Sequence, residues 1–272
     1  SQVAVSEFFS AEEPDCVILA AAKVGEIHAN STYPEEFIYE NLMIQSNVIH
    51  QSYLHGVKKL VYLGSICAYP KNAIQPMKEV SLLTGPLEPT NEPYVVAKIV
   101  GLKLCESYNR QYGTSYRTIM SINLYGIHDN SHSENSHVIP WMMRRIHEAK
   151  MADLPEVEIW GSGLTKREFL FVDDLVEACL FLLDYDEDYS PVIIGSQEEV
   201  SILELAEMMV EVVGYKGRLA FDTSKPDGMP LKKVDTSKMD ALGWNASTPF
   251  RAGLKNVCQW FLSNNISKNN KS

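Results

Sequence analysis

Short apolar runs alternate with long helical segments in the first part of the chain, and this alternation constrains the fold more than any other feature. Residues 16–22 and 59–63 are nearly continuous apolar runs of strand length, and residues 34–55 between them have the length and apolar spacing of a helix. A strand that is apolar on both faces is typical of a parallel sheet. Strand, long helix and strand in this order predict a right-handed β-α-β unit and an α/β fold.

The alternation continues with a helix at 92–112 and a strand at 116–122, and it weakens beyond residue 126. The chain ends in a segment rich in Asn, Ser and Lys at 263–272, for which we predict disorder. The further elements that we expect are helices at 138–150, 172–184, 202–213 and 250–262, and strands at 157–160, 192–194 and 218–221.

The composition is that of an ordinary globular protein. The 272 residues are 45% hydrophobic, yet no apolar run approaches the roughly 20 residues that cross a bilayer, and the first residues lack the features of a signal peptide. A formal net charge of −11 argues against non-specific nucleic-acid binding. The five cysteines are widely spaced without metal-type pairing, which is typical of reduced thiols. We therefore expect a soluble, cytoplasmic protein with no metal, no membrane and no nucleic-acid partner.

The stretch that carries chemistry-bearing side chains lies between the strand at 59–63 and the helix at 92–112. The strand is halted by glycine and delivers Ser65 and Cys67 at its carboxyl end. Tyr94 and Lys98 are four residues apart, so they share one face of the following helix. A lysine ammonium beside a phenol favours the phenolate, so we predict that the pKa of Tyr94 is lowered from its reference of about 10.

Tyrosine four residues before lysine is weak evidence alone, but three longer motifs surround it. They are Leu-Gly-Ser-x-Cys-x-Tyr-Pro at 63–70, Leu-x-Gly-Pro-Leu-Glu-Pro-Thr-Asn-Glu-Pro-Tyr at 83–94 and Asn-Leu-Tyr-Gly at 123–126. Over about residues 3–262 the chain closely resembles the GDP-L-fucose synthases, a family of extended short-chain dehydrogenase/reductases. The resemblance implies 3,5-epimerisation of GDP-4-keto-6-deoxy-D-mannose, followed by reduction of its C4 ketone with NADPH.

The resemblance also implies an architecture. It predicts a Rossmann-like, doubly wound parallel sheet in residues 1–125, which form the NADP-binding domain. Residues 126–262 would form mainly a smaller α/β substrate lobe, partly interleaved with the first domain. Family members associate through two long helices, so we expect a homodimer built on residues 34–55 and 92–112.

Five residues match the catalytic groups of the family. By resemblance, Tyr94 protonates the C4 oxygen, Lys98 tunes it and holds the nicotinamide ribose, and Ser65 bonds the ketone. Cys67 and His137 match the base and acid of epimerisation, and a thiol with a pKa near 8.5 can serve as a base against a carbon acid weakened by the ketone. Without the surrounding motifs, Tyr94 would be interpreted as a packed aromatic, Ser65 as a turn residue and Cys67 as a small buried apolar residue.

Binding residues are likewise implied by the resemblance. Arginine suits phosphate oxygens because its planar fork donates two hydrogen bonds at once, although without the family match the two arginines would read as solvated surface charges. The expected substrate-binding residues are Arg145, Trp160, Arg167 and Asp227. The expected cofactor-binding residues are Leu63, Gly64, Ser65, Ile66, Lys98, Ser121, Ile122, Asn123, Leu124 and His137.

The chain also departs from the family pattern. It lacks the Gly-rich turn, helix and second strand that receive a dinucleotide, and the only glycine before residue 56 is Gly25. We interpret the sequence as N-terminally truncated, the alternative being a domain that manages without those strands, and we expect residues 16–22 to form an exposed apolar edge. Individual departures occur at Glu26, Ile66, Ala68, Ser121, Ile122, Ile127 and Leu231.

Other functions remain open at this point. A 4,6-dehydratase would carry Thr-Asp-Glu at positions 65–67, where this chain has Ser-Ile-Cys, and a simple 4-epimerase would not need Cys67 and His137 together. From another class, the chain could be a non-catalytic scaffold or regulatory relative that binds a nucleotide sugar. The retained Ser65, Tyr94 and Lys98 argue against that alternative.

Overall fold

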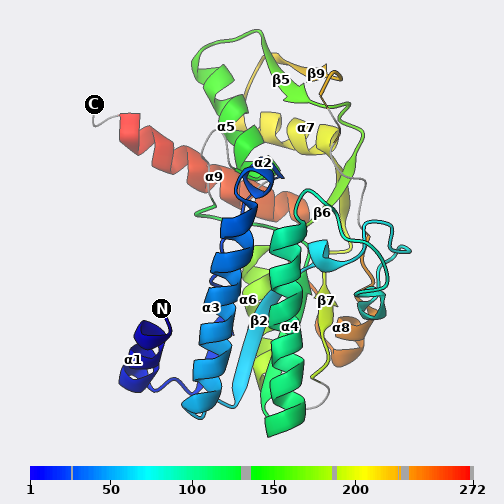
Figure 1. The fold of residues 1–272 in the computed structure, drawn as a ribbon. Coiled ribbons are helices and arrows are strands. Elements are labelled where there is room, and N and C mark those ends of the chain that lie inside the picture. Colours follow the sequence, from blue (N-terminus) through cyan, green and yellow to red (C-terminus); the bar gives the residue numbers. More distant parts are fainter. Residues whose placement is uncertain (26, 130–135, 186–188, 226, 228–232, 270–272) are drawn as a thin grey trace. The chain divides into compact units, whose positions relative to one another are not determined.

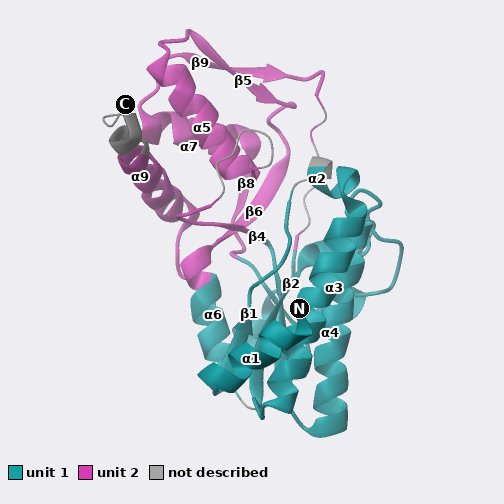
Figure 2. Cartoon of the chain, turned by 60° about the vertical axis from the view of Figure 1, so that its left-hand side comes forward, with its two compact units in different colours: residues 1–122, 175–195, 234–245 teal, residues 123–174, 196–233, 246–272 magenta. Residues whose placement is uncertain are grey.

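The computed structural model describes residues 1–25, 27–129, 136–185, 189–225, 227 and 233–269, and the chain divides into two compact units (Figure 2). Unit 1 contains residues 1–122, 175–195 and 234–245, and unit 2 contains residues 123–174, 196–233 and 246–272. The segments 175–195 and 234–245 belong to unit 1 although they follow residue 125 in the chain.

Unit 1 is built on a four-stranded parallel sheet in the order β1-β2-β3-β7. Its strands are β1 (Cys16–Leu19), β2 (Lys59–Ser65), β3 (Ser115–Ser121) and β7 (Val192–Ile194). The connection from β1 to β2 contains α3 (Pro34–Leu54), and the connection from β2 to β3 contains α4 (Glu92–Tyr112). The predicted α/β fold with a parallel sheet is thereby confirmed.

Helices cover both faces of this sheet. The long helices α3 and α4 lie side by side on one face, and residues 175–184 of α6 (Val172–Asp184) lie on the other (Figures 1 and 2). Under α3 and α4, Leu60 and Tyr62 of β2 pack with Tyr116 of β3 in one buried cluster. The remaining elements of unit 1 are α1 (Gln2–Glu12), α2 (Ile27–Thr32), α8 (Ser237–Leu242) and the short 3₁₀ helices η1 (Ile66–Ala68) and η2 (Glu79–Ser81).

Three details of unit 1 differ from expectation. The strand β1 ends at Leu19, and α2 forms in a region where the sequence analysis predicts no helix. The strand β2 does not stop at Gly64 but runs to Ser65. Gly64 lies within the strand at a position where a Cβ atom would come within 2.5 Å of the Met120 sulfur on the neighbouring strand, so a side chain does not fit there.

The strand β1 is an edge of the sheet in the described residues, as the sequence predicts. It pairs only with β2, and the Ile18 side chain on it is 41% exposed. The loop after β1 is nevertheless firmly held, because the buried Asn41 of α3 accepts a hydrogen bond from the Lys23 N–H at 3.0 Å and donates to the Lys23 carbonyl at 2.9 Å. The carboxyl end of β1 is therefore fixed against α3.

Unit 2 contains two small sheets. One has the order β4-β6-β8, and the other pairs β5 with β9 in parallel. Their strands are β4 (Asn123–Tyr125), β5 (Glu156–Trp160), β6 (Lys166–Phe171), β8 (Glu199–Ser201) and β9 (Arg218–Asp222). The sequence predicts β5 and β9 but misses β4, β6 and β8, which are short or carry polar residues at their ends.

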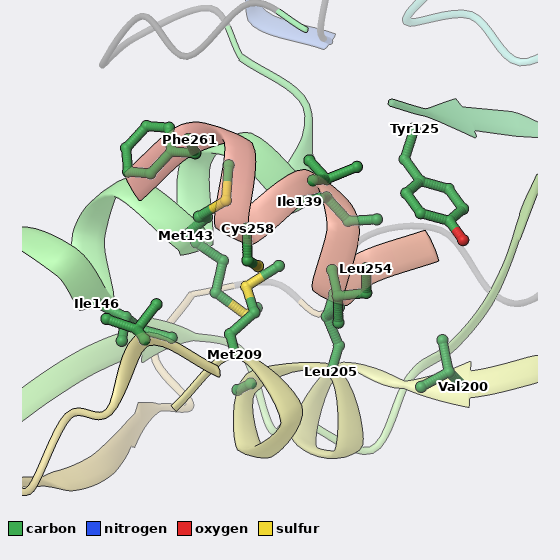
Figure 3. Packing of buried hydrophobic residues seen from close by; sticks show 14 of the residues in the cluster. Tyr125, Ile139, Met143, Ile146, Val200, Leu205, Met209, Leu254, Cys258 and Phe261 are labelled. Atoms are coloured by element: carbon green, nitrogen blue, oxygen red, sulfur yellow. The ribbon is translucent and has the colours of Figure 1, made fainter. Parts of the chain in front are cut away.

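Three helices surround a sulfur-rich core in unit 2. They are α5 (Val138–Met151), α7 (Ile202–Val213) and α9 (Phe250–Asn269). Figure 3 shows Met143 of α5, Met209 of α7 and Cys258 of α9 packed together. The helix α9 extends past residue 262 into the segment predicted to be disordered, and residues 270–272 lie outside the described part. None of the described helices is both long and apolar enough to span a membrane.

Candidate active site

The carboxyl ends of β2 and β3 lie together at one edge of the parallel sheet. The register pairs Ser65 with Ser121, and Gly64 with Met120. In open α/β sheets, ligands bind in the crevice outside the carboxyl ends of the strands. The predicted cofactor-binding segments at 63–66 and 121–122 therefore meet at the edge where a ligand is expected.

Ser65 and Cys67 are arranged by the short helix η1. Ser65 is its N-cap residue, and its hydroxyl oxygen accepts a hydrogen bond at 3.2 Å from the Cys67 backbone N–H. This bond occupies a lone pair of the oxygen and leaves the hydroxyl proton available to another acceptor. Cys67 is half-buried and lies close enough to Tyr94 to affect it electrostatically.

Tyr94 and Lys98 lie on the face of α4 that meets this strand end. The Lys98 ammonium donates a hydrogen bond to the Leu63 carbonyl at 2.8 Å and lies 5.8 Å from the centre of the Tyr94 ring. The Tyr94 ring also packs edge-on against Phe37 of α3, with 6.5 Å between ring centres. The structure thus brings Ser65, Cys67, Tyr94 and Lys98 of unit 1 into one neighbourhood.

The pKa prediction for Tyr94 is wrong. Burial, together with the nearby Cys67 thiolate, raises the pKa of Tyr94 above its usual value instead of lowering it. Burial also lowers the pKa of Lys98 to about 8, so the desolvated ammonium loses its proton more readily than that of an exposed lysine. At neutral pH Tyr94 is consequently a protonated phenol, which is the state that a proton donor requires.

In unit 2, Trp160, Arg167 and Asp227 lie together. The turn that follows Trp160 holds Asp227, because the Ser162 hydroxyl donates to its carboxylate at 3.0 Å. Arg167 donates to the Asp227 carbonyl at 3.4 Å. Hydrogen bonds from the Ser162 backbone and side chain lower the pKa of Asp227, so the carboxylate stays ionised. The neighbouring Gly161 has a positive φ of 87°, which favours glycine at this turn.

Arg145 joins this group through an aromatic residue that sequence reasoning misses. The Arg145 guanidinium lies 5.2 Å from the ring centre of Trp141, and Trp141 lies 5.6 Å from Trp160. Lys225 approaches the Trp160 ring to 5.7 Å. The signal for Trp141 is present in the sequence, since it precedes Arg145 by four residues on a predicted helix and so shares its face.

His137 begins the same helix. It is the N-cap residue of α5, and its Nδ1 atom lies 3.7 Å from a carboxylate oxygen of Asp129. The imidazole is about half exposed, with 51% of its side-chain surface accessible. His137, Trp141 and Arg145 therefore follow one another at four-residue intervals along α5.

Most departures from the family pattern are buried. Ile66, Ala68, Ser121 and Ile122 are almost inaccessible, whereas Ile127 is 39% exposed. The side chains of the first four therefore pack inside the protein. Glu26 and Leu231 lie outside the described residues.

Comparison with known proteins decides the family. Residues 1–195 match the model of the NAD dependent epimerase/dehydratase family. The chain belongs to this family. Among relatives, GDP-L-fucose synthase 1 of Arabidopsis thaliana is 56% identical over 263 residues, which are 97% of this chain and 81% of that protein. GDP-L-fucose synthase of Escherichia coli K12 is 53% identical over 270 residues, covering 96% of this chain and 84% of that protein.

A solved structure supports the fold of this epimerase/dehydratase. The GDP-L-fucose synthetase of Naegleria fowleri bound to NADP matches with a TM-score of 0.90 and 28% identity, covering 98% of this chain and 83% of that one.

Lys98 provides a test of whether this epimerase/dehydratase can hold a nicotinamide cofactor. Its ammonium has three donors, of which one bonds the Leu63 carbonyl, and no acidic partner is recorded among the described residues. A buried cation with unused donors fits the hydroxyl groups of a ribose. Lys98, with the backbone at the ends of β2 and β3, would therefore hold the nicotinamide ribose.

Proposed function

We propose that this epimerase/dehydratase converts GDP-4-keto-6-deoxy-D-mannose to GDP-L-fucose by 3,5-epimerisation and NADPH-dependent reduction at C4. The observation that carries the proposal is the grouping of Ser65, Cys67, Tyr94 and Lys98 at the carboxyl end of β2, in a chain more than half identical to GDP-L-fucose synthases. We assign cofactor binding mainly to unit 1 and nucleotide-sugar binding mainly to unit 2.

In the reduction, unit 1 supplies the proton and orients the ketone. The bound cofactor supplies a hydride to C4. Ser65 donates its free hydroxyl proton to the ketone oxygen, and Tyr94 transfers its phenolic proton to the same oxygen as charge develops there. Lys98 favours this transfer because a cation close to the phenol stabilises the phenolate that remains.

In the epimerisation at C3 and C5, Cys67 removes a proton from the carbon and His137 returns one. The C4 ketone acidifies the C–H bond at each neighbouring carbon, so a thiolate can remove the proton. Protonation from the opposite face inverts the centre, and we assign this step to the His137 imidazolium.

For the nucleotide sugar, we propose that Arg145 and Arg167 bind the diphosphate. A guanidinium donates two parallel hydrogen bonds to phosphate oxygens. Trp160, whose side chain is half exposed, offers a flat apolar face to the substrate, and Asp227 can accept hydrogen bonds from its hydroxyl groups. This role for unit 2 agrees with the cation–π contacts that already hold Arg145 and Lys225 over indole rings.

Turnover by the purified chain tests the function. Given the ketosugar and NADPH, we expect oxidation of one NADPH for each GDP-L-fucose formed, with the product identified by NMR. A product that keeps the configuration of the substrate at C3 and C5 would contradict epimerisation. Retained binding of the nucleotide sugar without any NADPH oxidation would favour the scaffold alternative.

We further propose that two copies associate through α3 and α4. Exposed apolar and aromatic side chains on these helices, among them Tyr39, Met43 and Tyr112, support an interface of this kind. Light scattering should give the mass of a dimer, and Met43→Glu should halve it, whereas a monomeric wild-type chain would refute the interface. The cytoplasm is the proposed location, consistent with five free cysteines.

A further inference from the structure

Among the described residues, no carboxylate pairs with the buried ammonium of Lys98. Its only hydrogen bond in the described residues goes to the Leu63 carbonyl, and the Lys98 residue is 6% exposed. Two ring faces lie near it instead. Tyr62 of β2 is the closer, with 5.1 Å from the ammonium to the ring centre, and Tyr94 lies at 5.8 Å.

The Tyr62 ring is held rigidly from three sides. It is 1% exposed, and its hydroxyl donates to the side-chain oxygen of Gln45 at 2.7 Å. Gln45 in turn donates to the Ala97 carbonyl at 2.6 Å and so ties α3, α4 and β2 together. Gly101 lies against the phenol, where any Cβ atom would collide with the ring and its oxygen.

Ordinary packing does not explain why a buried hydroxyl and its hydrogen-bond partner are kept at Tyr62. Burial raises the pKa of Tyr62, so its phenol stays neutral and its ring face keeps the negative potential that attracts a cation. A phenylalanine would fill nearly the same space without a hydroxyl that needs a buried partner. Gln45, Gly101 and the Tyr62 hydroxyl together fix the plane of one ring beneath one ammonium.

We propose that Tyr62 is a positioning residue that acts through Lys98: its ring face holds the lysine side chain in place and favours the charged ammonium over the neutral amine. The neighbouring titratable groups are Tyr94 on the same helix and Cys67 of η1, which lies near Tyr94. Neither side chain forms an ion pair with Lys98 in the part of the chain that the structure describes. The consequence for turnover rests on the proposed function, but the effect on Lys98 does not.

The direct test is a titration of Lys98 followed by the NMR shift of its labelled ε carbon, assigned through its loss in Lys98→Gln. Four proteins are compared: wild type, Tyr62→Phe, Tyr62→Phe carrying fluorine on the ring, and Tyr62→Leu. Fluorination withdraws the negative potential of the ring face with little change of shape, so it separates the cation–π contact from packing. Neither substrate nor cofactor is needed.

We expect Tyr62→Phe to keep the Lys98 pKa near that of the wild type, because the ring face remains. The fluorinated ring and Tyr62→Leu should lower this pKa by about half a unit to one unit. Equal pKa values for plain and fluorinated rings would overturn the proposal, and this comparison holds even if Tyr62→Leu fails to fold. If the pKa falls as expected but the wild type shows no turnover, the positioning role stands and the proposed function fails.

Where turnover is observed, the alkaline limb of the rate profile should move to lower pH in the fluorinated protein, by the same amount as the Lys98 pKa. A role of Tyr62 in structure alone would reduce the rate at every pH without moving the limb. An alkaline limb that stays in place while the Lys98 pKa changes would contradict the claim that the charge on Lys98 controls the rate.

Discussion

Lys98 of unit 1 and Arg145 of unit 2 lie in different surroundings. Lys98 in unit 1 is buried, its hydrogen-bonding partner is a carbonyl, and its pKa is lowered to about 8. Arg145 in unit 2 keeps 36% of its side chain exposed and lies 3.4 Å from Glu158. Solvent exposure and a carboxylate thus compensate the charge of Arg145, whereas the charge of Lys98 is only partly compensated.

This difference shows how reaction chemistry and substrate binding make separate demands on a protein. A group that transfers a proton gains from a desolvated site, because each interaction there is stronger and its pKa can be shifted. A group that binds a phosphate from solution needs access and a lasting charge, and each exposed contact contributes only modestly. Variants of Tyr94 and Lys98 in unit 1 should therefore change rates and titrations, and variants of Arg145 and Trp160 in unit 2 should change affinity.

The largest effect is expected for Tyr94→Phe. Loss of the phenolic proton should reduce kcat for NADPH oxidation by about 100- to 10,000-fold, while KM changes little. Steady-state kinetics measure both constants. Phe37→Leu, which removes only the ring that packs against Tyr94, is the matched control and should retain most of the rate. A Tyr94→Phe rate close to the wild type would place the proton donor elsewhere.

Lys98→Met should lower the activity and raise the stability of the protein. The folded chain carries a lysine whose pKa is depressed, so at pH 7 the buried charge costs up to about 3 kcal/mol, and its removal should raise the free energy of unfolding by about 1–3 kcal/mol. In the wild type, this cost falls as pH rises from about 8 towards 10.5, because the unfolded chain then holds a proton that the folded chain has lost. The advantage of the variant should shrink over the same range.

Denaturant titrations of both proteins at pH 7 and pH 9.5 measure this difference. Lys103→Met, on the exposed side of the same helix, should change stability little at either pH. If the gain in the free energy of unfolding from Lys98→Met grows with pH, the depressed pKa of Lys98 is contradicted.

In unit 2, Arg145→Ala should raise KM by about three- to tenfold and leave kcat within about twofold, because one partly exposed charge contact to phosphate is lost. The effect should decrease at high salt, which screens such contacts. Arg144, the adjacent residue on α5, pairs with Glu148 at 2.6 Å, so Arg144→Ala is the control and should leave KM unchanged. A fall in kcat with unchanged KM would break the division between the units.

The smallest effect is expected for Trp160→Leu. Loss of an exposed aromatic face should raise KM by about two- to fivefold, with no change in unfolding temperature. Leu164→Ala removes a still more exposed apolar side chain from the same unit and should leave both quantities unaltered. Unchanged KM in Trp160→Leu would remove this indole from the proposed binding surface.

The sequence predicts the long elements of unit 1 well. The expected helices 34–55 and 92–112 agree with α3 and α4 to within a residue, because length, apolar spacing and proline in the first turn point the same way. Strands of unit 2 such as β6 are missed. The charged Lys166 and Arg167 at its start shorten the apolar run that would indicate a strand, and its partners β4 and β8 are distant in sequence. Pairing between distant segments leaves no local signal.

Prediction of the site from the sequence has a similar limit. Spacing alone places Tyr94 and Lys98 on one face, and motifs select Ser65 and Cys67. The direction of the pKa shift at Tyr94 follows from burial, which spacing does not report, so its prediction is wrong. Tyr62 is missed for the same reason, because it lies in an apolar strand and only its contact with the ammonium distinguishes it from a core residue.

The central claim is that Cys67 serves the epimerisation and Tyr94 the reduction, and incorporation of solvent deuterium tests it most directly. The ketosugar is incubated in deuterium oxide with wild type, Cys67→Ser or Tyr94→Phe, and deuterium at C3 and C5 is measured by NMR. We predict deuterium at both carbons with the wild type and with Tyr94→Phe, and none with Cys67→Ser. Undiminished exchange in Cys67→Ser would contradict the account and return this thiol to a structural role.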